Sequence, residues 1–429
     1  MKNNPFFHLV LIINVFCLIV FFLGLPIPSG DFQFFHEPAI NFSQEGKIFS
    51  DGLSCLHPDV DKFFYLYPSG FSIIAGSFYK VLGVNQSTYQ LMSLIVFQLL
   101  FFSTFSMAWL VKRNLLTLSY SSADVYLIAL IAFPLFVSMG VSHPAALGNG
   151  LAMVAISLLF YLKNEKIRII VPALIFAISA IVAPYFAGVW FLVGIVAFYS
   201  KEGKIASISL ILVTSILAIL FLLAWYASMP FGFDQFLQQA SRGHISSNIS
   251  SGSDNLERMY SLKSDWLYNL KAHWKTLAYS MPSLMVLIYL TAKKEINPKA
   301  TIGILSLFTL VTVSVYFDFS KIMNFWPILI VFLASPLIKA IKSKNISLFL
   351  FISFSVFFLG FSNIKAFTSS LISGAGIQHK KYSEWIEQNI RSETVLVTST
   401  YFISTKKNVK RVYNLEWCPF LDNKKGITV

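Results

Sequence analysis

Residues 65–83 read YLYPSGFSIIAGSFYKVLG, and the fold of the chain depends on whether this stretch crosses a membrane. Its apolar part, 70–83, has about fourteen residues, whereas a helix needs roughly 20 to cross the hydrocarbon core. We therefore expect an amphipathic helix lying on the outer surface of the membrane, with Lys80 snorkelling toward the headgroups. A crossing helix here would move every later basic turn to the opposite side.

The composition is that of a polytopic membrane protein. The chain has 429 residues, of which 56% are hydrophobic, 16% aromatic and only 12% charged, and its mean hydropathy is +0.67. These values exclude a water-soluble globule. The net charge of +13 does not indicate nucleic-acid binding, because the cations are spread between apolar runs rather than gathered in one basic stripe.

Apolar runs of roughly 17 to 25 residues mark about eleven predicted spans. They are 8–27, 88–111, 123–141, 145–162, 169–184, 186–200, 205–226, 277–292, 300–317, 322–338 and 346–364. We interpret the first run as a retained signal anchor, because it follows Lys2 and has no clear cleavage site. The stretch 169–199 has basic turns at both ends and must cross an even number of times, so we expect a tight hairpin that bends at Pro184 and Tyr185.

The basic turns set the orientation. They all fall on the side of Lys2 and are Lys112/Arg113, Lys163/Lys166/Arg168, Lys201/Lys204, Lys293/Lys294/Lys299 and Lys339/Lys342/Lys344. The positive-inside rule therefore places the N-terminus in the cytoplasm and the C-terminus outside. We expect a multi-pass protein of a bacterial cytoplasmic (inner) membrane.

Three polar regions are predicted outside. The transmembrane domain, 1–364, includes two outer loops, 28–87 and 227–276, and an extracytoplasmic α/β tail occupies 365–429. The tail should contain an amphipathic helix over 379–391 and β-rich runs at 394–400 and 409–415. Cys55 and Cys418 both face outside in this map and could pair.

Four short motifs follow one another along the chain. The first is His36-Glu37-Pro38-Ala39-Ile40, followed by Ile48 and Gly52; later come Tyr67-Pro68-Ser69-Gly70, Ser142-His143-Pro144-Ala145, and Ser320-Lys321 before Phe325-Trp326-Pro327. Over roughly residues 1–340 this order resembles the GT-C superfamily of integral-membrane glycosyltransferases. The most similar branch holds protein O-mannosyltransferases and lipid A aminoarabinose transferases. The fold expected is an all-α polytopic membrane protein, a GT-C-like bundle with extracytoplasmic loop helices and a small C-terminal element.

The resemblance implies a reaction. A GT-C-like enzyme transfers a sugar from a polyprenyl-phosphate donor (dolichyl or undecaprenyl) to an acceptor hydroxyl with inversion, and one carboxylate acts as general base. Glu37 is the first candidate for that base, since it should begin the loop helix where the dipole and free N–H groups could orient it. Asp31 is the neighbouring alternative, and His36 stands where the family usually has Asp. The plain alternative for Glu37 is a carboxylate that only stabilises a helix N-terminus.

Other residues are candidates for binding substrate. Lys321 could neutralise the departing phosphate or simply snorkel, and Arg242 and Arg258 could bind phosphate or acceptor or only face water. His143 could hydrogen-bond a sugar or phosphate, or start a helix at the interface. Tyr67 could stack on a sugar ring or belong to the interfacial aromatic belt, and His36 lies beside the proposed base.

No cofactor is expected. His57, Asp59 and Asp61, with His36, have side chains suited to a divalent ion, but loop acids at alternate positions usually face water. The resemblance does not imply dependence on a metal either. The expected partners are the polyprenyl-phosphate sugar, a lipid, glycan or protein acceptor and membrane lipid, without nucleic acid.

Two alternatives remain open. A lipid-linked-saccharide transporter or flippase would need a polar path through the spans, which carry scarcely any ionisable side chain. The second alternative is a catalytically inactive relative that acts as an assembly partner. The histidine at position 36, in place of the usual aspartate, keeps this alternative open.

Overall fold

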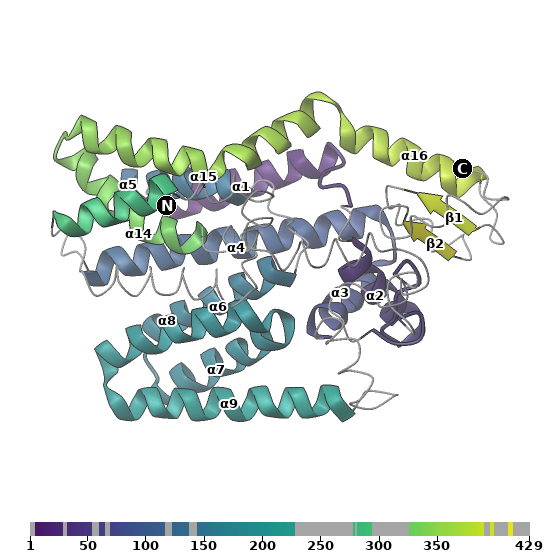
Figure 1. Ribbon diagram of the computed structural model, residues 1–429, viewed down its shortest axis with the longest axis horizontal. Helices are drawn as coiled ribbons and strands as arrows, with labels where there is room; N and C mark the ends of the chain where they lie inside the picture. The colour runs from purple at the N-terminus through teal and green to yellow at the C-terminus, as the bar shows by residue number, and fades with distance from the viewer. Residues whose placement is uncertain are drawn as a thin grey trace, which may run out of the picture.

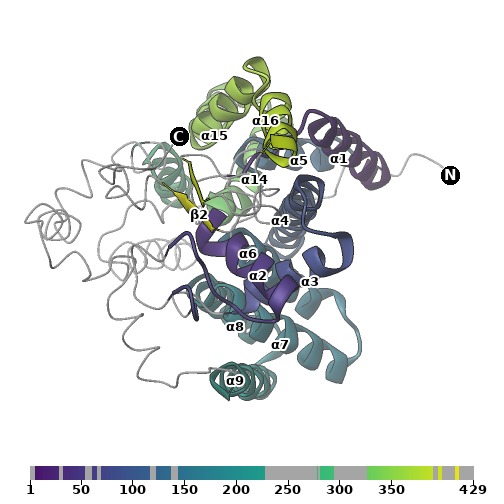
Figure 2. The same ribbon diagram turned by 90° about the vertical axis from the view of Figure 1, so that its right-hand side faces the viewer.

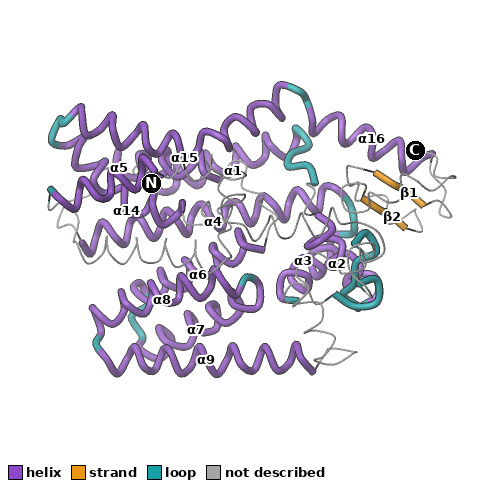
Figure 3. The backbone as a smooth tube through the Cα atoms, in the orientation of Figure 1, coloured by secondary structure: helices purple, strands orange, loops and turns teal. Residues whose placement is uncertain are grey.

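The protein is a bundle of long helices with several short elements gathered at one end (Figure 1). The computed structural model describes residues 5–28, 32–53, 60–64, 69–115, 122–136, 144–227, 278, 281–293, 326–389, 395–398 and 411–414. Within these residues the secondary structure is almost entirely helical, as Figure 3 shows. The predicted all-helical membrane bundle is therefore confirmed.

The long helices follow the predicted spans closely. They are α1 (Pro5–Phe22), α4 (Gln86–Leu115), α5 (Ser122–Phe136), α6 (Pro144–Tyr161), α7 (Glu165–Val182), α8 (Pro184–Glu202), α9 (Lys204–Ala227), α14 (Trp326–Lys342) and α15 (Ile346–Ile372). A further apolar helix covers Met281–Ala292. By length and composition, α1, α4, α6 and α9 could each cross a membrane. The predicted span 300–317 lies outside the described residues.

The predicted hairpin in 169–199 is confirmed. Helix α7 ends at Val182 and α8 begins at Pro184, so a single residue, Ala183, separates them. At the other end, Arg168 near the start of α7 forms a two-pronged ion pair with Glu202 at the end of α8, with N···O distances of 2.9 and 3.0 Å. The two helices are therefore antiparallel, and the basic turns on either side of them lie at the same end.

A second ion pair marks that same end of the bundle. Lys342, at the end of α14, lies 3.1 Å from the buried Asp124 at the start of α5. The turn from α8 to α9 and the turn from α14 to α15 both lie at the left-hand end of the bundle in Figure 1. The basic turns that carry these two ion pairs thus lie at one end of the bundle, as the charge pattern predicts.

The short elements lie at the opposite end and face the viewer in Figure 2. They are α2 (Phe32–Glu45), α3 (Gly70–Leu82), α16 (Ala375–Asn389) and two parallel strands, β1 (Val395–Thr398) and β2 (Arg411–Asn414), in which Val395 pairs with Arg411. The helix predicted over 70–83 and the helix and two strands predicted in the tail are confirmed. We call α2, α3 and residues 46–53 and 60–64 the cap.

The tail packs against the end of the first span, α1, in addition to following the last span, α15, in the chain. Helix α15 continues past the predicted end at residue 364 to Ile372, and α16 then packs on the end of α1. A Cβ at Gly376 would meet the carbonyl oxygen of Leu23, and one at Gly24 would lie 2.7 Å from that of Gly376. Only glycine allows two backbones to come this close. His379 of α16 also hydrogen-bonds Gln86 at the start of α4, at 2.9 Å.

Candidate functional site

The centre of the cap is the carboxylate of Glu37, which is fully buried. The Ser50 hydroxyl donates to Glu37 Oε2 at 2.8 Å, and the Gly52 N–H donates to both carboxylate oxygens at 3.2 and 3.3 Å. A carboxylate that accepts several hydrogen bonds in a buried site is held in one orientation. Glu37 therefore joins α2 to the loop that follows it.

Glu37 does not begin a helix, and that part of the prediction is wrong. Helix α2 starts at Phe32, so Glu37 lies in its second turn, followed by Pro38 inside the helix. A proline is common in the first turn, which favours a later start. Burial of aromatic side chains in the first turn extends the helix instead: Phe32 packs on Tyr89 and Phe35 on Phe71, with ring centroids 5.6 and 6.1 Å apart. Ser50 and Gly52, which donate to the carboxylate, belong to the loop after the helix.

The loop after α2 folds back on itself. The Ser50 N–H donates to the carbonyl of Val60, and the Phe64 N–H to that of Ile48, both at 2.9 Å. The side chain of Asn41, one turn after Glu37, donates to the carbonyl of Phe49 at 2.7 Å. Two buried side chains of α2, Glu37 and Asn41, thus hold residues 49–52 of the loop against the helix.

His36 lies inside an aromatic cluster formed by three helices. Its ring stacks on Phe32 at 5.0 Å and 17°, and meets the edges or faces of Phe71 at 5.3 Å and Tyr89 at 4.9 Å. Its Nδ1 and the hydroxyl of Tyr79 share a hydrogen bond of 2.9 Å. Only 2% of His36 is exposed, so the imidazole at this position holds α2 against α3 and α4.

The hydroxyl of Tyr79 keeps its proton over a wide pH range. Burial raises the pKa of Tyr79 well above its usual value of 10, and the neighbouring Tyr89 raises it further. A neutral phenol next to an imidazole is compatible with either ring tautomer, because the hydroxyl can donate or accept. The Tyr79 hydroxyl in the contact between α2 and α3 therefore stays neutral at physiological pH.

Helix α3 is wedged between α2 and the end of α7. Phe71, Ala75 and Tyr79 are buried at the i, i+4, i+8 spacing of one helix face, whereas Lys80 is exposed as expected. A Cβ at Gly76 would lie 2.7 Å from the Ala39 carbonyl oxygen of α2. Glycine at this position thus lets α3 pack closely on α2, and Gly70, whose Cβ would lie 2.6 Å from the Ile181 carbonyl oxygen, does the same for α3 against α7.

The structure describes only part of the predicted site. It places Glu37 and His36 side by side on α2. The other predicted site residues lie outside the described residues: Asp31, Tyr67, His143, Arg242, Arg258 and Lys321, together with His57, Asp59, Cys55 and Cys418. In the part of the chain that is described, no three His, Cys, Asp or Glu side chains lie close enough to hold a metal ion.

Sequence reasoning missed the partners of these two residues. The sequence motif includes Gly52 but gives no indication of Ser50, although both contact Glu37. Tyr79 and Tyr89 were missed as partners of His36. The i, i+4, i+8 pattern of α3 was the one signal that could have identified Tyr79 as buried.

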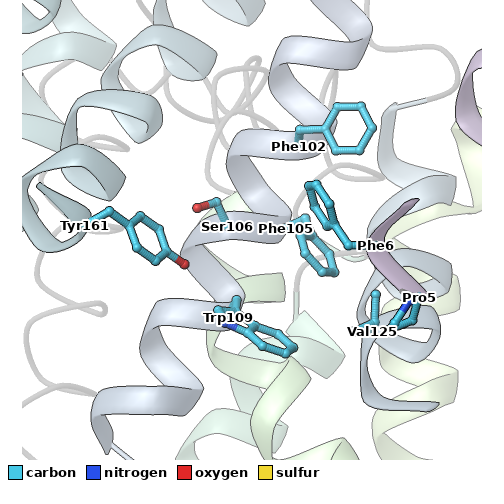
Figure 4. A pocket seen from close by; sticks show the side chains of 8 residues that line it. All are labelled: Pro5, Phe6, Phe102, Phe105, Ser106, Trp109, Val125 and Tyr161. Carbon is cyan, nitrogen blue, oxygen red and sulfur yellow. The ribbon is translucent and has the colours of Figure 1, made fainter. Parts of the chain in front are cut away.

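A cavity of about 400 Å³ lies far from the cap, among α1, α4, α5 and α6 (Figure 4). Its lining is mainly apolar and consists of Pro5, Phe6, Phe102, Phe105, Ser106, Trp109, Val125 and Tyr161. These residues come from the start of α1 and α5 and the ends of α4 and α6, which is the end of the basic turns. A lining of this kind is suited to an apolar group such as a hydrocarbon chain, and it lacks the charged side chains that sugar transfer would need.

No protein-family model matches the chain, and no curated protein sequence matches it. The chain is similar in structure to the crystal structure of ArnT from Cupriavidus metallidurans bound to undecaprenyl phosphate. The TM-score is 0.48 and the identity 11%, over 96% of this chain and 87% of that one. The fold and composition define a multi-pass helical membrane protein with a cap of short elements at one end.

Proposed function

We propose that the protein is a membrane glycosyltransferase that takes a sugar from a polyprenyl-phosphate donor and transfers it with inversion to a hydroxyl of a lipid, glycan or protein. The observation that supports this most is the fixed, buried carboxylate of Glu37 in the cap at one end of an apolar helical bundle. The resemblance of the motif around His36 and Glu37 to GT-C enzymes supports the same function.

In the proposed reaction the acceptor oxygen attacks the anomeric carbon from the face opposite the phosphate. The acceptor proton passes to Glu37, the bond between the anomeric carbon and the phosphate oxygen breaks, and polyprenyl phosphate leaves. Ser50 and Gly52 orient the Glu37 carboxylate, so that little reorganisation is needed when the acceptor arrives. Asp31 is the alternative base, and Lys321, with Arg242 and Arg258, is proposed to neutralise the leaving phosphate.

The proposed orientation follows from the charges. The end that carries the Arg168–Glu202 and Lys342–Asp124 ion pairs is cytoplasmic, and the cap and tail are outside. Donor lipid would enter the cap from the outer leaflet, while the acceptor would approach from the extracytoplasmic side.

A variant of the base tests the proposal. Membranes that contain the Glu37→Gln variant should transfer label from a radiolabelled polyprenyl-phosphate sugar at least about 100-fold more slowly than wild-type membranes. Glu45→Gln is the matched control, because Glu45 lies on the same helix but is exposed. Wild-type transfer rates in a well-expressed Glu37→Gln variant would rule out this base, and movement of the lipid across the membrane without transfer would favour a flippase instead.

A further inference from the structure

Three polar side chains follow one face of the membrane-spanning helix α4. Gln86, Gln90 and Ser93 are spaced i, i+4 and i+7, which places them above one another on a helix. Gln90 is 4% exposed and Ser93 is fully buried. The side-chain nitrogens of Gln86 and Gln90 and the hydroxyl of Ser93 are buried and have no hydrogen-bond partner. We call these three residues the α4 polar stripe.

Leaving such groups unpaired is costly. A buried donor without a partner costs about 1 to 3 kcal/mol in a protein interior. Other hydroxyls on the same helix avoid this cost: Ser103 donates to the carbonyl of Leu100 at 3.0 Å, and Thr104 contacts Met153 Sδ at 3.5 Å. Ser93 is on the same helix, yet its hydroxyl makes no such bond. Polar groups kept unpaired inside a membrane helix commonly serve binding or transport.

The stripe starts directly below the cap. Tyr89, next to Gln90 in the chain, packs on His36 and donates its hydroxyl to the carbonyl of Ile27 at 3.4 Å. The side-chain oxygen of Gln86 is already bonded to His379. From Gln86 to Ser93 the helix rises about 10 Å. The stripe therefore leads from the cap into the outer half of the bundle.

The chemistry of the stripe indicates its ligand. Two amide NH2 groups, each with two N–H donors, and one hydroxyl are neutral donors, and the hydroxyl can also accept. Neutral donors in a row complement the oxygens of a carbohydrate, whereas a phosphate is held best by cations or by charge-assisted bonds. A sugar hydroxyl that bonds these groups would also remove their desolvation penalty.

We propose that Gln90 and Ser93, with Gln86, form a sugar-binding subsite for the carbohydrate part of a lipid-linked saccharide. This inference rests on the proposed function for the identity of the lipid carrier. It goes beyond that function by assigning recognition of the sugar to α4, below Glu37, and not to the cap loop alone.

Binding measurements on the purified full-length protein in lipid nanodiscs test the subsite. The probes are undecaprenyl phosphate and undecaprenyl phosphoryl glucose, mannose and arabinose. The wild-type protein should bind at least one of the three sugar lipids about tenfold or more tightly than undecaprenyl phosphate. Gln90→Leu and Ser93→Ala should each reduce that preference about tenfold, without changing the affinity for undecaprenyl phosphate.

Two matched controls lie on the same helix. Ser103→Ala removes a hydroxyl that bonds its own helix, and Gln98→Leu removes an amide that donates to Asn14 at 3.4 Å. Both should keep the wild-type preference. Ser93→Ala should not lower the melting temperature of the ligand-free protein, because it removes an unpaired group, and it therefore tests binding even if Gln90→Leu folds poorly.

The outcomes separate the subsite from the proposed function. An unchanged preference in Ser93→Ala and Gln90→Leu overturns the subsite. A wild-type protein with no preference for any of the three sugars overturns it as well. If the preference exists and both variants lose it, but no sugar is transferred, the subsite stands and the transferase proposal fails.

Discussion

The hydrogen bonds of Glu37 give a quantitative prediction for the stability of the cap. The Glu37→Gln variant keeps the shape of the side chain but loses the negative charge that faces the Ser50 hydroxyl and the Gly52 N–H. A hydrogen bond to a charged group contributes about 1.5 to 3 kcal/mol, and the amide still accepts one of them. We expect the cap to open more easily by about 2 to 3 kcal/mol.

Hydrogen exchange read by mass spectrometry measures this local opening directly. Each 1.4 kcal/mol is a factor of ten, so peptides covering 46–53 should lose protection about 30-fold to 150-fold in Glu37→Gln. Ser50→Ala should lose about tenfold, because one of the donors remains. The exposed Glu45→Gln substitution should change protection less than twofold. Protection within twofold of wild type in Glu37→Gln would refute the inference that this carboxylate holds the loop on α2.

Three further predictions concern other contacts. Gly376→Ala should destabilise the protein by about 1 to 3 kcal/mol, since its Cβ meets the Leu23 carbonyl, whereas Gly188→Ala, with open space around it, should be neutral or stabilising; thermal unfolding of both variants in detergent decides this. A double-mutant cycle of Arg168→Gln and Glu202→Gln should give a coupling of about 1 to 2 kcal/mol, because the pair is two-pronged and only partly exposed; a coupling near zero would show that the hairpin does not depend on it. Stability should fall as pH rises above about 10, where Tyr79 ionises in the unfolded chain but not in the folded protein, and Tyr79→Phe should make this fall shallower by up to about 1.4 kcal/mol per pH unit; equal slopes in the two proteins would contradict the raised pKa.

The long helices and the hairpin could be predicted because they depend on local composition. Apolar run length and the position of cations follow directly from the sequence, and the ion pair between Arg168 and Glu202 shows that the hairpin begins and ends on one side. The tail strands were predictable for the same reason, since β-branched and apolar residues are concentrated at 395–398 and 411–414.

The contacts of the site could not be predicted, because they join residues far apart in the chain. Ser50 reaches Glu37 only after the loop has turned back, and His36 is enclosed by side chains from three helices. The start of α2 was misplaced for a related reason: packing of Phe32 and Phe35 outweighs the local preference for a start near Pro38. Gly24 and Gly376 meet from the two ends of the chain, and no local pattern indicates such a contact.

The unpaired groups of the α4 polar stripe could not be predicted from the sequence either. A glutamine or serine in an apolar span usually bonds its own helix or a neighbour, as Ser103 does. Only the structure shows that Gln90 and Ser93 do not. They lie on the helix whose Tyr89 packs on His36, next to Glu37 in the chain.

The most direct test of the proposed glycosyltransferase compares envelope glycolipids and glycoproteins from cells that have the gene, lack it, or carry Glu37→Gln. Mass spectrometry should find one sugar modification, a single pentose or hexose mass, in the wild type, and find it absent both from cells without the gene and from cells with the variant. Identical glycolipid and glycoprotein masses in all three would contradict the transferase.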